Sequence, residues 1–188
     1  DTPWSHQGTY WQYNEVVVEP PSTQKPHPQI WMGAGSPRSV KQVAQLGFNM
    51  LLGQFDSFEM IAEEVALFKS EVESLGRVFD PMSVAVARSV NLVDSTAEYD
   101  QALKSRMAAR RRTQNLALRP DFQDTRDSAE AGTIYGSPDQ VSEKIQALHD
   151  IGIEYVLLNA PAGISTLRRF AEDVMPGFPG ANQAAAKR

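Results

Sequence analysis

Apolar residues along this chain follow two alternating patterns. Short apolar runs predict buried β-strands at residues 29–32, 48–52, 82–93 and 154–158. Apolar residues spaced three and four positions apart predict amphipathic helices at residues 37–46, 57–75, 96–112, 138–151 and 167–174. Because short apolar strands alternate with helices, the pattern indicates an α/β fold with a parallel sheet. Four such strands are half of the number in a (β/α)8 barrel.

Three further segments flank or interrupt this alternation. Residues 4–18 combine aromatic and β-branched positions and predict a hairpin, and the proline-rich stretch 20–28 predicts a stiff extended connector. Residues 113–134 have no clear period, so we expect either a functional lid or a disordered segment there. We therefore predict one domain over residues 1–180 and a flexible tail over residues 181–188.

Composition narrows the classes of function. The 188 residues are 41% hydrophobic and 22% charged, which is typical of a soluble globular protein. A formal charge of −5 gives no reason to expect nucleic acid or a membrane surface as a partner, and no apolar run approaches the roughly 20 residues of a transmembrane helix. The lack of cysteine excludes disulfides and thiolate sites and fits a cytoplasmic protein. The three histidines, His6, His27 and His149, do not have metal-site spacing, so we expect no metal.

The strongest local candidate for chemistry is a glycine-rich turn between a strand and a helix. Gly33 and Gly35 remove side chains where the strand ends, and Ser36 and Pro37 are favoured at the first positions of a helix. Free backbone N–H groups and the positive end of the helix dipole then point to one spot, where Ser36 and Ser39 add hydroxyl donors. The pattern predicts a phosphate cradle; the alternative is a well-capped helix that binds no ligand.

Two other features carry weaker signals. Residues 136–138 repeat the Gly-Ser-Pro turn, but Asp139 and Glu143 follow, and acidic side chains in the first turn favour an unliganded cap. The basic segment Lys104 to Arg112 lies at the end of a predicted helix. It either complements the negative end of the helix dipole or forms a basic lid edge that holds a phosphate or an anionic substrate.

Several stretches together resemble the bacterial-luciferase-like flavin-dependent monooxygenases. In the first part of the chain they are Gly8-Thr9-Tyr10-Trp11, Val18-Glu19-Pro20-Pro21, the run from Gln24 to Gly33, and Ser36-Pro37. In the last part they are Gly136 to Val141, Gly152 to Val156 and Phe170 to Pro176. Their order and rough spacing match the family over about residues 4–178. The combination is specific, whereas any single stretch is weak.

The resemblance implies a TIM-type barrel, of which this chain covers roughly the C-terminal four βα units. It implies an oxidoreductase that uses reduced FMN and O2 on a small organic substrate, often with FMN supplied by a separate flavin reductase. It places Gly33, Gly35, Ser36 and Ser39 where the family holds the flavin phosphate, and residues 113–134 where the family has a mobile active-site insertion. Alternatives are a deazaflavin-dependent reductase of the same fold, or a non-catalytic flavin-binding remnant.

The resemblance covers only the second half of the family's domain, so no catalytic residue is carried over and activity of this chain alone is not expected. A half-barrel leaves unpaired strand edges and an apolar inner face. We therefore expect the chain to pair with a second copy of itself or with a missing N-terminal half. A stably monomeric chain in light scattering would count against this expectation.

Overall fold

A computed structural model describes the chain at residues 2–113 and 125–178. Its internal contacts divide it into two units, Asp1–Ile30 and Trp31–Arg188. The first unit contains a hairpin of β1 (Trp4–Gln7) and β2 (Gln12–Val16), which pair antiparallel, so the predicted hairpin is confirmed. All nine of these strand residues are exposed. The second unit carries the sheet and the helices, and the candidate site lies entirely within it.

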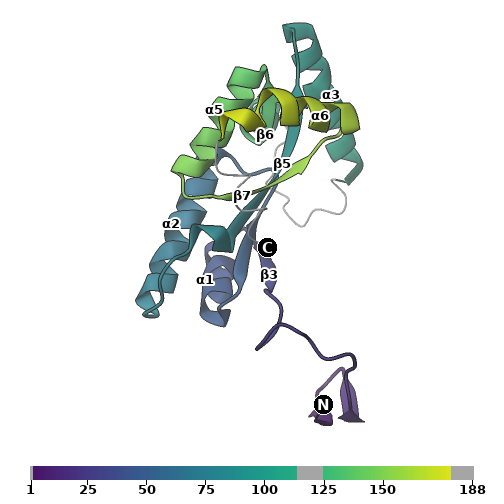
Figure 1. Cartoon of the computed structure of the whole chain (residues 1–188), viewed down its shortest axis with the longest axis vertical. Coiled ribbons are helices and arrows are strands. Elements are labelled where there is room, and N and C mark those ends of the chain that lie inside the picture. Colours follow the sequence, from purple (N-terminus) through teal and green to yellow (C-terminus); the bar gives the residue numbers. More distant parts are fainter. Residues whose placement is uncertain (1, 114–124, 179–188) are drawn as a thin grey trace. The chain divides into compact units, whose positions relative to one another are not determined.

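The second unit is built on a parallel sheet with strands β3 (Trp31–Ala34), β4 (Asn49–Leu52), β5 (Val84–Leu92), β6 (Thr133–Gly136) and β7 (Tyr155–Asn159). Strands β3, β4, β5 and β7 correspond to the four predicted strands and lie side by side in that order. Figure 1 shows the long strand β5 between them. The predicted α/β fold class is therefore confirmed, with four neighbouring strands arranged as in half of a barrel.

Strand β6 was not predicted. Val86 pairs with both β4 and β7, and Ser89 pairs with both β6 and β7. Strands β4 and β6 therefore follow one another along one edge of β5, and β7 occupies the other edge. The expectation of a lid or a disordered segment over residues 113–134 is wrong for its last part, which forms α4 (Arg126–Ala131) and the start of β6. Helix α4 is only six residues long, too short for a helical period to show, and β6 has an apolar run of only two residues, Ile134 and Tyr135. Residues 114–124 lie outside the described part of the chain.

The main helices match the prediction closely. They are α1 (Pro37–Leu46), α2 (Phe58–Ser74), α3 (Thr96–Thr113), α5 (Pro138–Asp150) and α6 (Ile164–Asp173). Ser36 caps α1, and Gly47 ends it in the left-handed conformation with φ 72°, as the sequence predicts. Helix α6 starts three residues earlier than predicted because its N-cap is Gly163, which offers no side-chain capping signal. Short 3₁₀ turns at Pro81–Ser83 (η1) and Met175–Gly177 (η3) precede β5 and follow α6.

The two faces of the sheet differ. On one face, alternate residues of β5 pack with α1, α2 and α5 in a single apolar cluster that includes Val84, Val86, Val43, Phe68 and Val141. In Figure 1 these three helices follow one side of the sheet, and α3 begins beyond the end of β5. We call the opposite face, which carries Ala85, Ala87, Ser89 and Asn91 of β5, the inner face. The register places the side chains of β7 at Tyr155, Leu157 and Asn159 on it.

Candidate functional site

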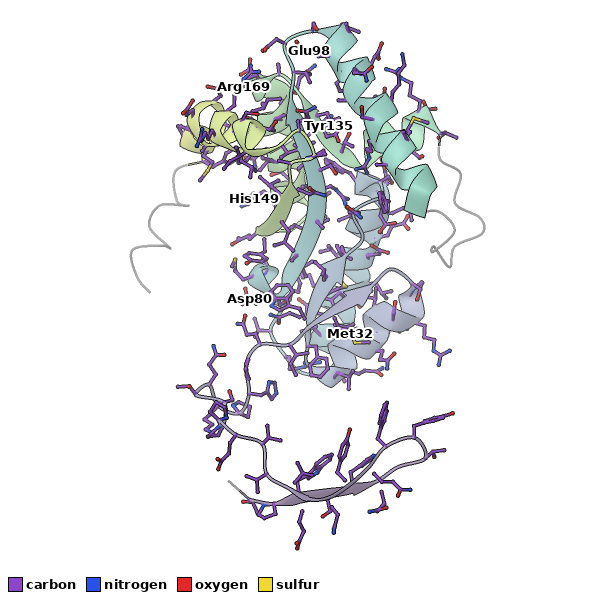
Figure 2. The ribbon with its side chains drawn as sticks, turned by 90° about the vertical axis from the view of Figure 1, so that its right-hand side faces the viewer. Met32, Asp80, Glu98, Tyr135, His149 and Arg169 are labelled. Atoms are coloured by element: carbon purple, nitrogen blue, oxygen red, sulfur yellow. The ribbon has the colours of Figure 1, made fainter. Side chains whose placement is uncertain are left out.

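A cleft of about 730 Å³ lies at the carboxyl end of β5. Its walls are the loop after β4 (Gln54, Phe55), the end of β5 and the residue after it (Ser89, Asn91, Leu92, Val93), one face of α3 and the residues after β7 (Pro161, Ala162). Figure 2 shows Tyr135 and Glu98, two residues near it, at one end of the sheet, while Asp80, which precedes β5, lies toward the other end. The carboxyl end of parallel strands is where α/β barrels bind their ligands.

The four residues of the predicted cradle are brought together at the start of α1. The Ser39 hydroxyl accepts hydrogen bonds from the backbone N–H groups of Gly35 (3.2 Å) and Ser36 (3.1 Å) and donates to the Ser36 carbonyl (2.9 Å). The two serine Oγ atoms lie 2.9 Å apart. A Cβ built on Gly33 would meet nothing within 4 Å. Because β3 and β5 run parallel to β4, this turn lies at the same end of the sheet as the cleft.

The turn has the properties that phosphate binding needs. Ser36 and Gly33 are exposed, α1 has ten residues, and no acidic side chain lies in its first turn. The serines cap the helix through one another, so a phosphate would exchange these exposed hydrogen bonds for its own. Both expectations for the turn, the cradle and the plain cap, are consistent with these contacts, and the cradle stays a prediction.

The second Gly-Ser-Pro turn has the same capping box as the first but is less accessible. The Oε1 atom of Gln140 accepts a hydrogen bond from the Ser137 N–H at 3.0 Å, and the same atom would lie only 2.6 Å from a Cβ built on Gly136. Gly136 is buried with φ 151°. A second cleft, of about 570 Å³, borders this turn, and its lining carries both acidic side chains and the ammonium of Lys144. The contrast with the first turn therefore rests on accessibility and on Asp139 in the first turn of α5.

A buried arginine of α3 forms one wall of the larger cleft. Arg106, 8% exposed, donates from Nη1 to the Ser89 hydroxyl (2.9 Å) and from Nη2 to the carbonyls of Gln54 (3.2 Å) and Gly132 (3.3 Å). Its guanidinium also lies 5.2 Å from the centre of the Phe55 ring. For Arg106, the expectation that the basic segment merely complements the helix dipole is therefore wrong. The periodicity of a mixed-charge helix gave no sign that this arginine is buried.

Tyr135 of β6 completes this wall. It is 1% exposed and packs with Leu103 and Ala129. Burial raises the pKa of its hydroxyl, while the charge of Arg106 and hydrogen bonds with Ser89 and Arg106 act in the opposite direction. The tyrosine hydroxyl therefore stays protonated at ordinary pH. Tyr135 was not among the predicted site residues, because it lies in the strand that was not predicted.

A second buried arginine, Arg88, lies on the opposite face of β5. It is fully buried and donates to the carbonyls of Gly53 (2.7 Å), Ala87 (3.0 Å) and Asp56 (2.8 Å). Burial lowers the pKa of Arg88 to about 10, and Asp56 opposes that shift. A sequence signal existed, because strict alternation places Arg88 on the apolar face of the strand with Val86 and Val90.

The histidines do not gather around either cleft. His6 stacks on Trp4 in the hairpin, while His27 and His149 are exposed. Within residues 2–113 and 125–178, no group of three or more histidine, aspartate or glutamate side chains could hold a metal ion. In the same ranges, every helix is too short or too polar to cross a membrane.

Residues 1–155 match the family model of the luciferase-like monooxygenases. The chain belongs to this family. Its sheet is accordingly part of a TIM-type barrel, and the resemblance seen in the sequence is confirmed.

Individual relatives of this luciferase-like chain are distant. The oxygenase component of the flavin-dependent trigonelline monooxygenase of Acinetobacter baylyi (strain ATCC 33305 / BD413 / ADP1) is 21% identical over 201 residues, which cover 93% of the chain and 55% of the relative. Monooxygenase RslO1 from Streptomyces bottropensis shares the fold with a TM-score of 0.72 and 21% identity, over 95% of this chain and 56% of that one. An F420-dependent secondary alcohol dehydrogenase in complex with an F420-acetone adduct gives a TM-score of 0.73 at 13% identity, over 93% and 56%. The chain thus spans about half the length of these proteins.

Proposed function

We propose that this chain is the C-terminal portion of a flavin-dependent monooxygenase that uses reduced FMN and O2 on a small organic substrate. One observation carries the proposal. The open glycine-serine turn after β3 lies at the same end of the sheet as the 730 Å³ cleft, so a phosphate site and a space for a substrate face the same mouth of the barrel. Family membership supports the same reading.

The residues of the turn fit the phosphate end of a flavin. Gly33 leaves open space for a close approach, Gly35 carries no side chain, and Ser36 and Ser39 present two hydroxyls beside the N-terminus of α1. Reduced FMN, when bound, supplies the electrons with which O2 is activated. The role of this chain is to bind the phosphate, to orient the cofactor toward the cleft, and to exclude water with the walls that α3 and Tyr135 form.

We propose a separate flavin reductase as the partner, because the reaction consumes FMN in its reduced form. The relative from Acinetobacter baylyi is an oxygenase component, which supports a two-component system. We expect the inner face to be covered by an N-terminal half or by a second copy of the chain. Tyr155 and Leu157 are 43% and 41% exposed on that face, and strand edges without partners associate.

The second candidate is a deazaflavin-dependent reductase. The fold likeness to an F420-dependent alcohol dehydrogenase favours it, and the same turn would hold the phosphate of that cofactor. A third possibility, a flavin-binding half-barrel without catalysis, follows from the length of the chain relative to its relatives.

The decisive experiment compares ligands that differ at the phosphate. FMN, riboflavin and a deazaflavin are titrated into the purified chain, alone and together with an N-terminal half from a relative, and flavin fluorescence is followed. The cradle predicts that FMN binds at least about tenfold more tightly than riboflavin, because riboflavin lacks the charged acceptor at the helix terminus. Equal binding of FMN and riboflavin, or no binding in either preparation, would contradict the cradle. Preference for the deazaflavin would select the second candidate.

A further inference from the structure

The loop between β4 and α2 is held from two sides by arginines. From the sheet, Arg88 donates to the carbonyls of Gly53 at 2.7 Å and Asp56 at 2.8 Å. From α3, Arg106 donates to the carbonyl of Gln54, between those two positions, at 3.2 Å. This loop forms part of the cleft wall, so its conformation depends on a residue of the sheet and on a residue of the overlying helix.

Arg106 connects more of the molecule than this loop. Its guanidinium also bonds the Ser89 hydroxyl of β5 and the Gly132 carbonyl before β6, and it lies over the Phe55 ring. Four segments that are far apart in the sequence therefore meet at one planar group. Packing around it is close, because a Cβ on Gly132 would lie 3.1 Å from the Phe55 carbonyl oxygen and 3.2 Å from Nη2 of Arg106. A planar fork with five donors can satisfy this arrangement, whereas a lysine ammonium cannot.

The helix that Arg106 secures lines the cleft with small and polar side chains. Gln101, Ser105 and Ala109 lie at successive turns of α3 and all border the cleft. Ser105 and Ala109 are small and leave the volume open, and the position of α3 relative to β5 sets how large that volume is.

We propose that Arg106 is the positioning residue that fixes α3 as a wall of the cleft and thereby sets the space for the organic substrate. The inference deepens the proposed function and rests on it for the identity of the occupant. Arg106 acts through α3 and the β4–α2 loop rather than through contact with the cofactor phosphate, whose cradle lies after a different strand.

The remaining contacts of α3 show what its loss would change. The middle of the helix packs through Leu103 against Tyr135 and Ala129, and Asp100 forms an exposed ion pair with Arg126 of α4 at 2.6 Å. These contacts keep α3 helical and docked near its middle. If the guanidinium of Arg106 is removed, the part of α3 near Ser105 and Ala109 loses its hydrogen bonds to the facing β4–α2 loop.

The test uses the full chain with Arg106→Lys, Arg106→Gln and, as the matched control, Arg126→Gln. The control removes an exposed arginine that contacts the same helix from α4. Hydrogen exchange of backbone amides reports residues 53–57 and 103–109, with α1 as the internal reference. We expect exchange in both segments to become about tenfold faster in the two Arg106 variants, because hydrogen bonds from a charged group are lost, with α1 unchanged. The control should resemble the wild type.

A second readout separates positioning from a general loss of structure. In the preparation that turns over substrate with a reductase, the Arg106 variants should raise the KM for the organic substrate about tenfold, and the affinity for FMN should stay within about twofold of the wild type. If Arg106→Gln does not fold, Ser89→Ala is measured in its place. It removes only one hydrogen-bond acceptor of Arg106, so amide exchange in the same two segments should become about threefold faster.

Two results overturn the inference. One is wild-type exchange of residues 53–57 in Arg106→Lys, which shows that the fork is not needed. The other is equal acceleration in α1, which shows that Arg106 supports the whole fold rather than the cleft wall. If the wild type binds no flavin at all, the proposed function fails, while the exchange measurements still decide whether Arg106 positions α3.

Discussion

The chain forms the same Gly-Ser-Pro turn twice, and the two copies differ in what surrounds them. The turn before α1 is the more accessible: Ser36 is exposed, Gly35 is half-buried, and Gly33, two residues earlier on β3, has free space where a side chain would be. The turn before α5 is less accessible, because Gly136 is buried, Ser137 is half-buried, and Gln140 fills the space beside Gly136. The two turns therefore share their capping chemistry. The accessibility of the turn and the charge in the first helical turn distinguish the candidate binding site from the structural cap.

The largest difference should appear when a side chain is added beside the first turn and within the second. Gly33→Val places an isopropyl group in open space on β3, two residues before the first turn, so the free energy of unfolding should change little. FMN binding should weaken about 100-fold, or about 2.7 kcal/mol, because the backbone loses its close approach to the ligand. Gly136→Val should do the reverse, lowering the free energy of unfolding by about 1–3 kcal/mol through the strained φ and the contact with Gln140.

Urea unfolding and flavin titration of both glycine variants measure this difference. A Gly33→Val protein that still binds FMN as tightly as the wild type would remove the first turn from the cofactor site. A Gly136→Val protein of unchanged stability would show that the second turn is less closed than its contacts indicate.

An intermediate difference should appear when the caps are removed. Ser36→Ala and Ser137→Ala each delete an N-cap side chain, and each should lower the free energy of unfolding by about 1 kcal/mol. Only Ser36→Ala should also weaken FMN binding, by about tenfold, since a hydroxyl donor to the phosphate is lost. Thermal denaturation with and without FMN checks both effects. The comparison breaks down if both variants, or neither, lose affinity for FMN.

The smallest difference concerns charge in the first turn. Arg38 and Asp139 occupy equivalent positions, directly after Pro37 and Pro138. Arg38→Asp should stabilise the ligand-free helix by about 0.3–1 kcal/mol and weaken FMN binding about threefold, because the carboxylate itself neutralises the positive end of the dipole. Asp139→Arg should lower the free energy of unfolding by a similar amount. Calorimetric titration at low and high salt measures the effect, which salt should diminish in both variants.

The sequence alone predicted the elements whose signals are local. The cap at Ser36 and the helix end at Gly47 follow from single residues, the long helices follow from periods over ten or more positions, and the four predicted strands follow from apolar runs. Helix α4 was missed because six residues show no helical period, and strand β6 because its apolar run is only Ile134 and Tyr135. Helix α6 was placed late because Gly163 gives no capping signal.

The part of the site formed by distant contacts could not be predicted. Arg106 looked like one of several arginines on a polar helix, and its burial depends on the loop after β4 and on the unpredicted β6. Arg88 differs, because its position in an alternating strand placed a charge on an apolar face and should have marked it. A charged residue on an apolar stripe is thus detectable from the pattern, whereas a charged residue on a mixed helix is not.

Because β6 pairs with the end of β5, the segment between Val93 and Gly136 can be exchanged as a unit. The segment leaves β5 at Val93 and returns at Gly136, and the Val93 N–H donates to the Gly136 carbonyl at 3.0 Å. Its entry and exit therefore lie side by side, on a part of that edge of β5 that β4 does not use. Segments of different length or sequence can be inserted between these two points without changing the register of β3, β4, β5 and β7. Such a junction allows the wall of the cleft to be replaced, by evolution or by design, while the barrel strands stay as they are.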